Sequence, residues 1–455
     1  MFRTLANAFK IADLRKKMLF TLLIVLIYRI GANITVPFIS KGYLGNALSG
    51  GGILGFQNIL SGGAFEQSTL FALGVSPYIT ASIVIQLLTV AIPALERLAQ
   101  QGEEGKKKMT QITRLVTIVI SIITALGYFF MLKNWGAINR YQYFTTPEKV
   151  LLAVALVACF CAGSALVMWL AEKINEHGIG NGISIILFAN IVSRVPSMFS
   201  EMRDMLKLFG WKQTPQKWGV GFAFCVFVVL FMLAMIWFII FISDSERRIP
   251  VQYAKKVVGR KMYGGQNTNL PIKLNMTGVM PIIFASSIVG IPSMIAMFIP
   301  SGRVPIWLEK VVSFFSTVSW VYALILFVLI IAFAYFYVAI SFNPIEVAGN
   351  LQKNGGSIPG IRPGKATSDF ITRVLSRVTL IGAIALGLIA VVPQVLQLLT
   401  NIVTTHVQNG DYAAWFNINS LVFGGSSIII VVGVILETIR EIEGQMTMRH
   451  YKGFL

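Results

Sequence analysis

The chain has 455 residues, of which 55% are hydrophobic and only 13% are charged, and its formal net charge is +19. Long apolar runs along the whole length, with a mean hydropathy of +0.73, exclude a water-soluble globular protein and indicate an integral membrane protein. The three cysteines lie inside apolar runs and the three histidines are scattered, so the sequence predicts no metal site.

A membrane-spanning helix needs roughly 20 apolar residues, and ten segments of the chain fit this length. The first follows a basic N-terminus, but no small-residue cleavage pattern comes after it, so we expect a retained helix rather than a signal peptide. In chain order the predicted spans are residues 18–36, 74–95, 112–132, 149–171, 182–200, 218–242, 276–299, 318–341, 371–393 and 419–437.

The segment between the first two spans, residues 50–67, is rich in glycine and half apolar. It is too polar to face lipid, and irregular backbone is tolerated at membrane depth only where protein or a water-filled cavity surrounds it. We therefore expect a short helix folded into a pore.

One charge, Arg29, lies about 17 Å along the first span at 1.5 Å per residue. Its side chain can snorkel to the outer interface, or it can pair with a partner inside the channel. The sequence leaves both interpretations open.

Loops on the side of the two termini carry more than twice as many Lys and Arg residues as the opposite loops, which marks both termini as cytoplasmic. The outer loop 194–217 is also basic and is interpreted as an amphipathic surface helix. Five spans in residues 1–210 and five in 211–455 predict two halves of opposite orientation, because each half has an odd number of spans.

All 19 carboxylates lie in loops, in tails or at span edges, whereas ion-coupled transporters usually keep an ionisable residue at mid-membrane. The sequence has no HExxH, GxSxG or Walker A motif, and the glycines of residues 178–182 predict a tight turn into the fifth span. These absences favour a protein that is not an enzyme and that uses no metal or cofactor.

Six segments spread over most of the chain form a specific set: PYITASIVIQLL (77–88), QQGEEGKKK (100–108), GIGNGISIILFANIV (178–192), NMTGVMPIIFASS (275–287), PGIRPGKAT (359–367) and FGGSSIIIVV (423–432). In sequence and order they resemble the SecY family, the channel subunits of the bacterial Sec protein-translocation complex. The resemblance implies two five-helix halves around an hourglass pore, a plug helix within residues 51–67, and a lateral gate between the second and seventh spans.

The resemblance further implies a pore ring of six aliphatic side chains, although spacing alone would make them ordinary packing residues. These are Val75, Ile79, Leu187, Ile191, Ile283 and Ile430. An aliphatic collar offers ions no replacement for their water and tends to dewet.

The lateral gate carries over to six positions on the second and seventh spans. These are Thr80, Ile83 and Gln86, facing Asn275, Ser287 and Ile291. Polar contacts between helices in lipid contribute on the order of 0.6–2 kcal/mol each, so a few of them would hold a gate closed at rest.

The cytoplasmic loops 243–275 and 342–370 are basic. Such loops can serve as topology determinants and lipid contacts, but the resemblance implies docking of a motor or a ribosome. The docking positions carried over are Arg248, Arg260, Lys261 and Arg362, and Lys365 stands where relatives often have an acidic residue.

Together these features predict a passive channel that exports signal-bearing polypeptides across the bacterial cytoplasmic membrane and inserts membrane proteins laterally into it. The implied partners are SecE, SecG, the SecA motor, the ribosome, signal peptides, nascent polypeptides and anionic lipids. The alternatives are an accessory SecY paralogue with a restricted set of substrates, a secondary solute transporter and an intramembrane enzyme.

Overall fold

A computed structural model describes most of the chain. The described residues are 7–40, 53–138, 141, 144–197, 199–200, 203, 215–253, 256–258, 261–263, 267–296, 298, 319–406 and 425–452. Most of the predicted outer amphipathic helix in 194–217 therefore lies outside the described residues.

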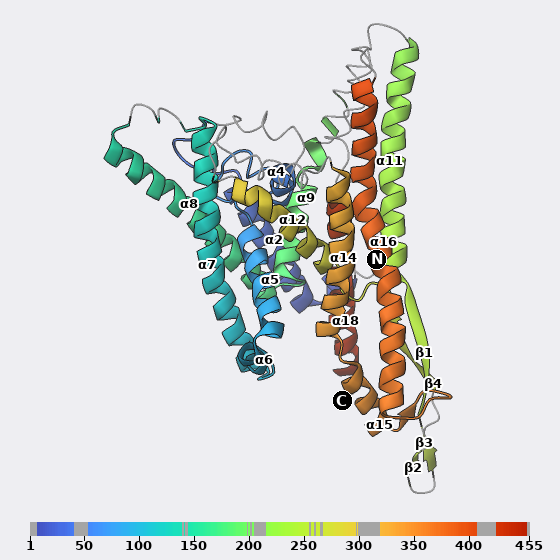
Figure 1. Ribbon diagram of the computed structural model, residues 1–455. Helices are drawn as coiled ribbons and strands as arrows, with labels where there is room; N and C mark the ends of the chain where they lie inside the picture. Colours follow the sequence, from blue (N-terminus) through green and yellow to red (C-terminus); the bar gives the residue numbers. More distant parts are fainter. Residues whose placement is uncertain are drawn as a thin grey trace.

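A helix stands at each of the ten predicted spans, which confirms the all-α membrane fold (Figure 1). The first five are α2 (Ala12–Gly31), α5 (Ser76–Ala91), α7 (Glu103–Asn134), α8 (Thr146–His177) and α9 (Gly182–Val192). The second five are α11 (Pro215–Asp244), α12 (Met280–Ala296), α14 (Trp320–Ser341), α16 (Lys365–His406) and α18 (Gly425–Lys452).

By length and apolar composition alone, five helices within the described part of the chain could cross a membrane, and a bent pair makes a possible sixth. That pair is α5 and α6 (Pro93–Ala99), which meet at 107°. The bend follows from Pro93, because the residue before a proline avoids the helical region and Ile92 is extended. The first helix of the second predicted span therefore ends at Ala91, and α6 begins inside the predicted range 74–95.

The short helix α4 (Ile53–Leu60) lies inside the segment where the plug was predicted. It contacts α9 and α12, and in Figure 1 it lies at the end of the helix bundle opposite α6. The prediction of a short inserted helix after the first span is confirmed.

The core is one large cluster of buried apolar side chains, here called the central cluster, which includes Tyr28, Leu60, Ile79, Leu187, Ile283 and Ile430. Its members come from α4 and from every span-forming helix except α7. Because this core joins both predicted halves, the division at residue 210 stays a prediction.

Large apolar side chains also cover the outside of the bundle, as Leu22, Leu151, Trp237 and Leu324 show. An apolar exterior suits a protein surrounded by lipid tails, which are as apolar as leucine. Because apolar side chains are both buried inside the bundle and exposed outside it, the apolar residues of a span are not confined to one helix face.

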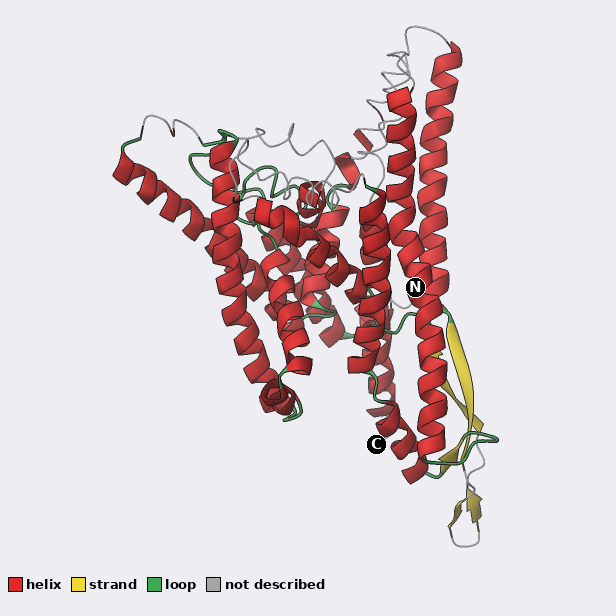
Figure 2. Cartoon of the chain, viewed as in Figure 1, coloured by secondary structure: helices red, strands yellow, loops and turns green. Residues whose placement is uncertain are grey.

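The second described feature is a small sheet outside the bundle, in the order β4-β1-β5. β1 (Glu246–Tyr253) pairs antiparallel with β4 (Asn267–Lys273) and with β5 (Gly356–Ser357). A distal hairpin of β2 (Lys256–Val258) and β3 (Lys261–Tyr263) extends from it, and α15 (Pro344–Lys353) lies beside it (Figure 2). We call β1 to β5 and α15 the strand unit.

The strand unit joins the two loops that the sequence analysis treated separately. Ile249, Ile272 and Ile358 form an apolar cluster with Val338 at the end of α14 and Ile371 on α16. The strand unit and α6 lie at the same end of the molecule (Figure 1), as expected if their loops share one side of the membrane.

Candidate functional site

The tight turn predicted at residues 178–182 positions α9 at the centre of the bundle. Asn181 caps the helix, since its Oδ1 accepts from the Ile183 backbone N–H at 3.1 Å, and Asn175 Oδ1 accepts from Gly182 N–H at 2.7 Å. An ideal Cβ on Gly182 would lie 1.9 Å from the Ala171 carbonyl oxygen, so only glycine allows this close approach of α9 to α8.

All six predicted ring residues are buried in the central cluster, with exposed fractions of 0% to 4%. Val75 and Ile79 lie at the start of α5, and Leu187 and Ile191 follow the same spacing of four on α9, so each pair shares one helix face. Ile283 on α12 and Ile430 on α18 come from the other predicted half. The structure thus gathers the six positions into one apolar core, and their role as a pore ring stays a prediction.

The helix α4 reaches the same core, because Leu60 at its C-terminal end is a member of the central cluster. The buried side chains of the cluster are apolar except for the hydroxyls of Tyr28 and Tyr322. Such a core offers ions and water few hydrogen-bonding groups.

The sequence analysis did not single out Asn190, a buried amide next to the ring residue Ile191. Its Nδ2 donates to the Leu60 carbonyl at 2.7 Å and to the Tyr28 hydroxyl at 2.8 Å. The signal available in the sequence was a single amide side chain within a mostly apolar helix, because such a group needs buried partners.

Arg29 turns toward the protein interior, which decides between its two interpretations. Its Nη1 lies 3.5 Å from Asn190 Oδ1, and an ideal Cβ on Gly62 would lie only 2.7 Å from the same nitrogen. The guanidinium therefore sits beside the end of α4 rather than snorkelling away from it.

At the predicted gate, α5 and α12 are in contact. The hydroxyls of Thr80 and Ser287 donate to carbonyls of their own helices, those of Ser76 at 3.1 Å and Ile283 at 2.8 Å. Ile83 is buried in the central cluster.

The remaining three gate positions differ from one another. Gln86 Oε1 and Asn275 Oδ1 are buried and have no hydrogen-bond partner among the described residues, and Asn275 precedes the start of α12 at Met280. Ile291 is 42% exposed. No hydrogen bond between the predicted gate side chains is seen among the described residues. The gating role of these positions stays a prediction.

The predicted docking residues lie on or beside the strand unit, as far as they are described. Arg248 is exposed on β1, where its Nε donates to Glu246 Oε1 at 2.7 Å. Lys261 lies on β3, Arg362 is exposed between β5 and α16, and Arg260 lies outside the described residues. Burial, with a smaller contribution from the positive charge of Arg440, lowers the pKa of Lys273 at the end of β4.

A family model described as SecY matches residues 69–439. The Protein translocase subunit SecY of Streptomyces scabiei is 40% identical over 465 aligned residues, which cover 100% of both chains. The chain belongs to the SecY family.

Solved structures agree on the fold. A SecY protein, whose plug domain stabilises the closed state of the translocation channel and maintains a membrane seal, superposes with a TM-score of 0.61 at 16% identity. That match covers 95% of this chain and 92% of the other. The Sec61 channel in the canine ribosome-channel complex superposes with a TM-score of 0.57 at the same identity, and covers 95% and 92%. This SecY-family chain is a multi-pass membrane protein.

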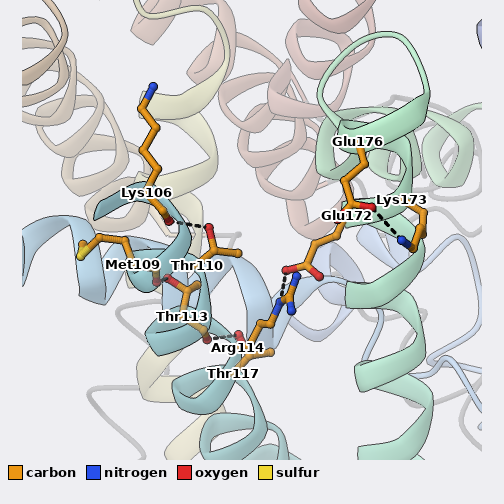
Figure 3. Close-up of polar contacts among 9 residues, drawn as sticks. All are labelled: Lys106, Met109, Thr110, Thr113, Arg114, Thr117, Glu172, Lys173 and Glu176. Atoms are coloured by element: carbon orange, nitrogen blue, oxygen red, sulfur yellow. Dashed lines mark hydrogen bonds and ion pairs between the residues drawn. The ribbon is translucent and has the colours of Figure 1, made fainter. Parts of the chain in front are cut away.

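One buried carboxylate of the chain has an ion-pair partner. Arg114 on α7 donates to Glu172 on α8 at 2.8 Å (Figure 3), where the Glu172 side chain is 10% exposed and that of Arg114 is 44% exposed. The pair lies near the end of α8 rather than at mid-membrane, and a paired carboxylate does not offer a free site for a transported cation. Within the described residues, no group of three or more His, Cys, Asp or Glu side chains could hold a metal ion.

Proposed function

We propose that this SecY-family chain forms the protein-conducting channel that exports signal-bearing polypeptides across the bacterial cytoplasmic membrane and releases membrane proteins sideways into lipid. The observation that carries the proposal is the burial of six aliphatic side chains, contributed by both predicted halves, in one core that α4 also enters. Membership of the SecY family supports it.

In the proposed mechanism the closed channel is sealed by apolar packing. The ring side chains offer no hydrogen bonds, so ions cannot exchange their hydration shells for protein ligands. A polypeptide that displaces α4 replaces the lost apolar contacts with its own side chains, and aliphatic groups yield to it without binding any side chain specifically.

The gate would open when a signal sequence packs between α5 and α12. We further propose that the buried oxygens of Gln86 and Asn275 favour this step. They have no hydrogen-bond partner among the described residues, a buried acceptor without a partner costs about 1–3 kcal/mol, and opening would let water or a passing chain reach them.

We assign the strand unit and both termini to the cytoplasmic side, where SecA or a ribosome would dock. The exposed basic side chains of Arg248 and Arg362 suit phosphate-rich RNA or acidic protein surfaces and anionic lipids. SecE and SecG are proposed as the small membrane subunits, on the strength of the family alone.

The proposal is tested by reconstituting the chain with its small subunits and the SecA motor in lipid vesicles. A precursor with a signal sequence should become protected from added protease in the presence of ATP, and the same precursor without its signal should stay accessible. Equal protection of the two precursors, or none with a functional motor present, would contradict the proposal.

A further inference from the structure

We propose that Asn190 is a positioning residue that latches α4 in the closed channel, through a hydrogen bond to the carbonyl at the end of that helix. The inference rests on the proposed function in one respect, namely that α4 leaves its closed position when a polypeptide passes. It adds to that function the residue that sets how firmly the closed position is held.

The latch bond joins two parts of the chain that are 130 residues apart in sequence. Leu60 ends α4, and the last carbonyls of a helix have no partner within it. Asn190 supplies that partner from α9 at 2.7 Å, and both residues are buried. The second N–H of the same amide donates to the Tyr28 hydroxyl at 2.8 Å, which fixes the orientation of the side chain.

The chain beyond α4 is held elsewhere, by contacts that do not involve Asn190. The Tyr128 hydroxyl on α7 donates to the Phe65 carbonyl at 2.6 Å and also lies 2.8 Å from Ser68 Oγ. Backbone bonds from Val36 N–H to Ser68 and from Leu70 N–H to Ile34 secure the same turn. Residues 65–70 are therefore an anchor, and α4 lies on the other side of two glycines.

Those glycines, Gly62 and Gly63, both have a positive φ, at +65° and +88°. They differ in surroundings, since an ideal Cβ on Gly62 would lie 2.7 Å from Arg29 Nη1 and 3.0 Å from Asn190 Oδ1, whereas one on Gly63 would meet nothing within 4 Å. The end of α4 thus fits against the latch only because residue 62 has no side chain.

One further tie acts inside the segment itself. Asn58 Nδ2 donates to Glu66 Oε2 at 2.9 Å, and the Glu66 backbone N–H donates to Asn58 Oδ1 at 3.2 Å. This pair couples α4 to the anchored turn but not to the channel wall. Among the described hydrogen bonds, that of Asn190 is the one that joins the end of α4 to the neighbouring helix α9.

The decisive experiment measures ion leak through the purified complex in vesicles, together with export of a precursor that carries a defective signal. Asn190→Leu and Asn190→Asp keep the size of the side chain but remove its N–H donors. Each should raise the resting leak about tenfold, the order expected when a buried acceptor loses its donor, and should allow export of the defective precursor. Ser193→Ala on the same helix removes a local hydroxyl bond to the Asn190 carbonyl and should leave both readouts unchanged.

A second pair of variants tests the latch without altering α9. Gly62→Ala and Gly63→Ala strain similar backbone conformations, but only the first places a methyl group against Arg29 and Asn190. Gly62→Ala should therefore leak several-fold more than Gly63→Ala, and equal leak in the two would overturn the latch.

The latch is also overturned if both Asn190 variants assemble and neither leak nor export of the defective precursor changes. Export of the intact precursor should persist in every variant, because the latch holds the closed state only. If the wild-type complex itself exports nothing, the proposed function is wrong. The ion leak of the variants relative to the wild type still tests the latch in that case.

Discussion

At the scale of single residues, the core of this channel depends on the absence of polar atoms as much as on packing. The six predicted ring side chains are almost completely inaccessible, and the buried amide of Asn190 stands next to one of them, Ile191, in the chain. A polar atom placed in the ring itself would have no partner, and burying it would cost roughly 1–3 kcal/mol in the closed state while favouring hydration.

Ile283→Asn should therefore hydrate the ring and weaken the seal. We expect a higher resting ion leak and easier export of precursors with defective signals, measured in vesicles that contain the purified complex. Ile283→Leu keeps the apolar volume and serves as the control. A leak equal to the wild type in Ile283→Asn would show that this position does not line the constriction.

The two side chains of the Arg114–Glu172 ion pair differ in exposure, so we expect their substitutions to lower the stability of the protein by different amounts. Arg114→Gln leaves a buried carboxylate without its partner and should destabilise the protein by roughly 3 kcal/mol. Glu172→Gln leaves a half-exposed guanidinium that water can solvate, so it should cost less. Thermal unfolding of the purified protein in detergent measures both, and the reverse order of stability would contradict the assignment.

At the scale of elements, the strand unit packs against α14 and α16, and the chain that leads into it is held by the last helix. Arg440 Nη2 on α18 donates to the Ser243 carbonyl at 2.7 Å and to Asp244 Oδ1 at 2.8 Å, at the point where α11 ends. The Leu274 N–H then bonds to the Ser245 carbonyl at 2.9 Å and closes the base of the two long strands. We therefore expect the position of the strand unit to depend on a residue far from it in sequence.

Arg440→Ala should loosen the strand unit without unfolding the bundle, because a charge-assisted hydrogen bond contributes about 1.5–3 kcal/mol. We expect faster chymotryptic cleavage within residues 246–273 and a several-fold weaker affinity for the motor or ribosome. Arg248→Ala is the contrasting variant, since Arg248 pairs with its neighbour Glu246 on the same strand, β1. It should reduce docking while leaving the cleavage rate unchanged, and faster cleavage in both variants would remove the special role of Arg440.

At the scale of the whole molecule, one apolar core joins two sets of helices that must part if a chain is to leave sideways. The contact between α5 and α12 is where the proposed mechanism opens this core toward lipid. Ile291 on α12 is 42% exposed, so this predicted gate position lies at the outer surface of the bundle.

A disulfide across this contact tests the opening directly. Cysteines at Thr80 and Ile291, in a chain whose three free cysteines Cys159, Cys161 and Cys225 are replaced, should cross-link at rest and stop export when oxidised. Reduction should restore export, and each single cysteine variant serves as the control. Normal export through an oxidised, fully cross-linked channel would exclude α5 and α12 as the moving contact.

Much of this architecture follows from local properties of the sequence. Apolar length predicts the ten spans and the asymmetry of basic residues predicts their orientation, because insertion into a bilayer depends on each segment and its flanking charges. The glycine-rich segment predicted the short helix that the structure has at Ile53–Leu60, and the motifs carried the family. Proline also acts locally, but the predicted span 74–95 includes Pro93 because it was defined by apolar length alone, and the bend there was not predicted.

Contacts between distant segments were decided by the tertiary structure alone. The hydrogen bond of Asn190 to Leu60, the inward turn of Arg29 and the pairing of β1 with β5 each join parts of the chain that no local pattern connects. Hydropathy determines which segments enter the membrane, but it does not state which side chains meet there, because many helix arrangements bury the same apolar faces. Only the packed structure selects one of these arrangements, and with it the partners of each buried polar group.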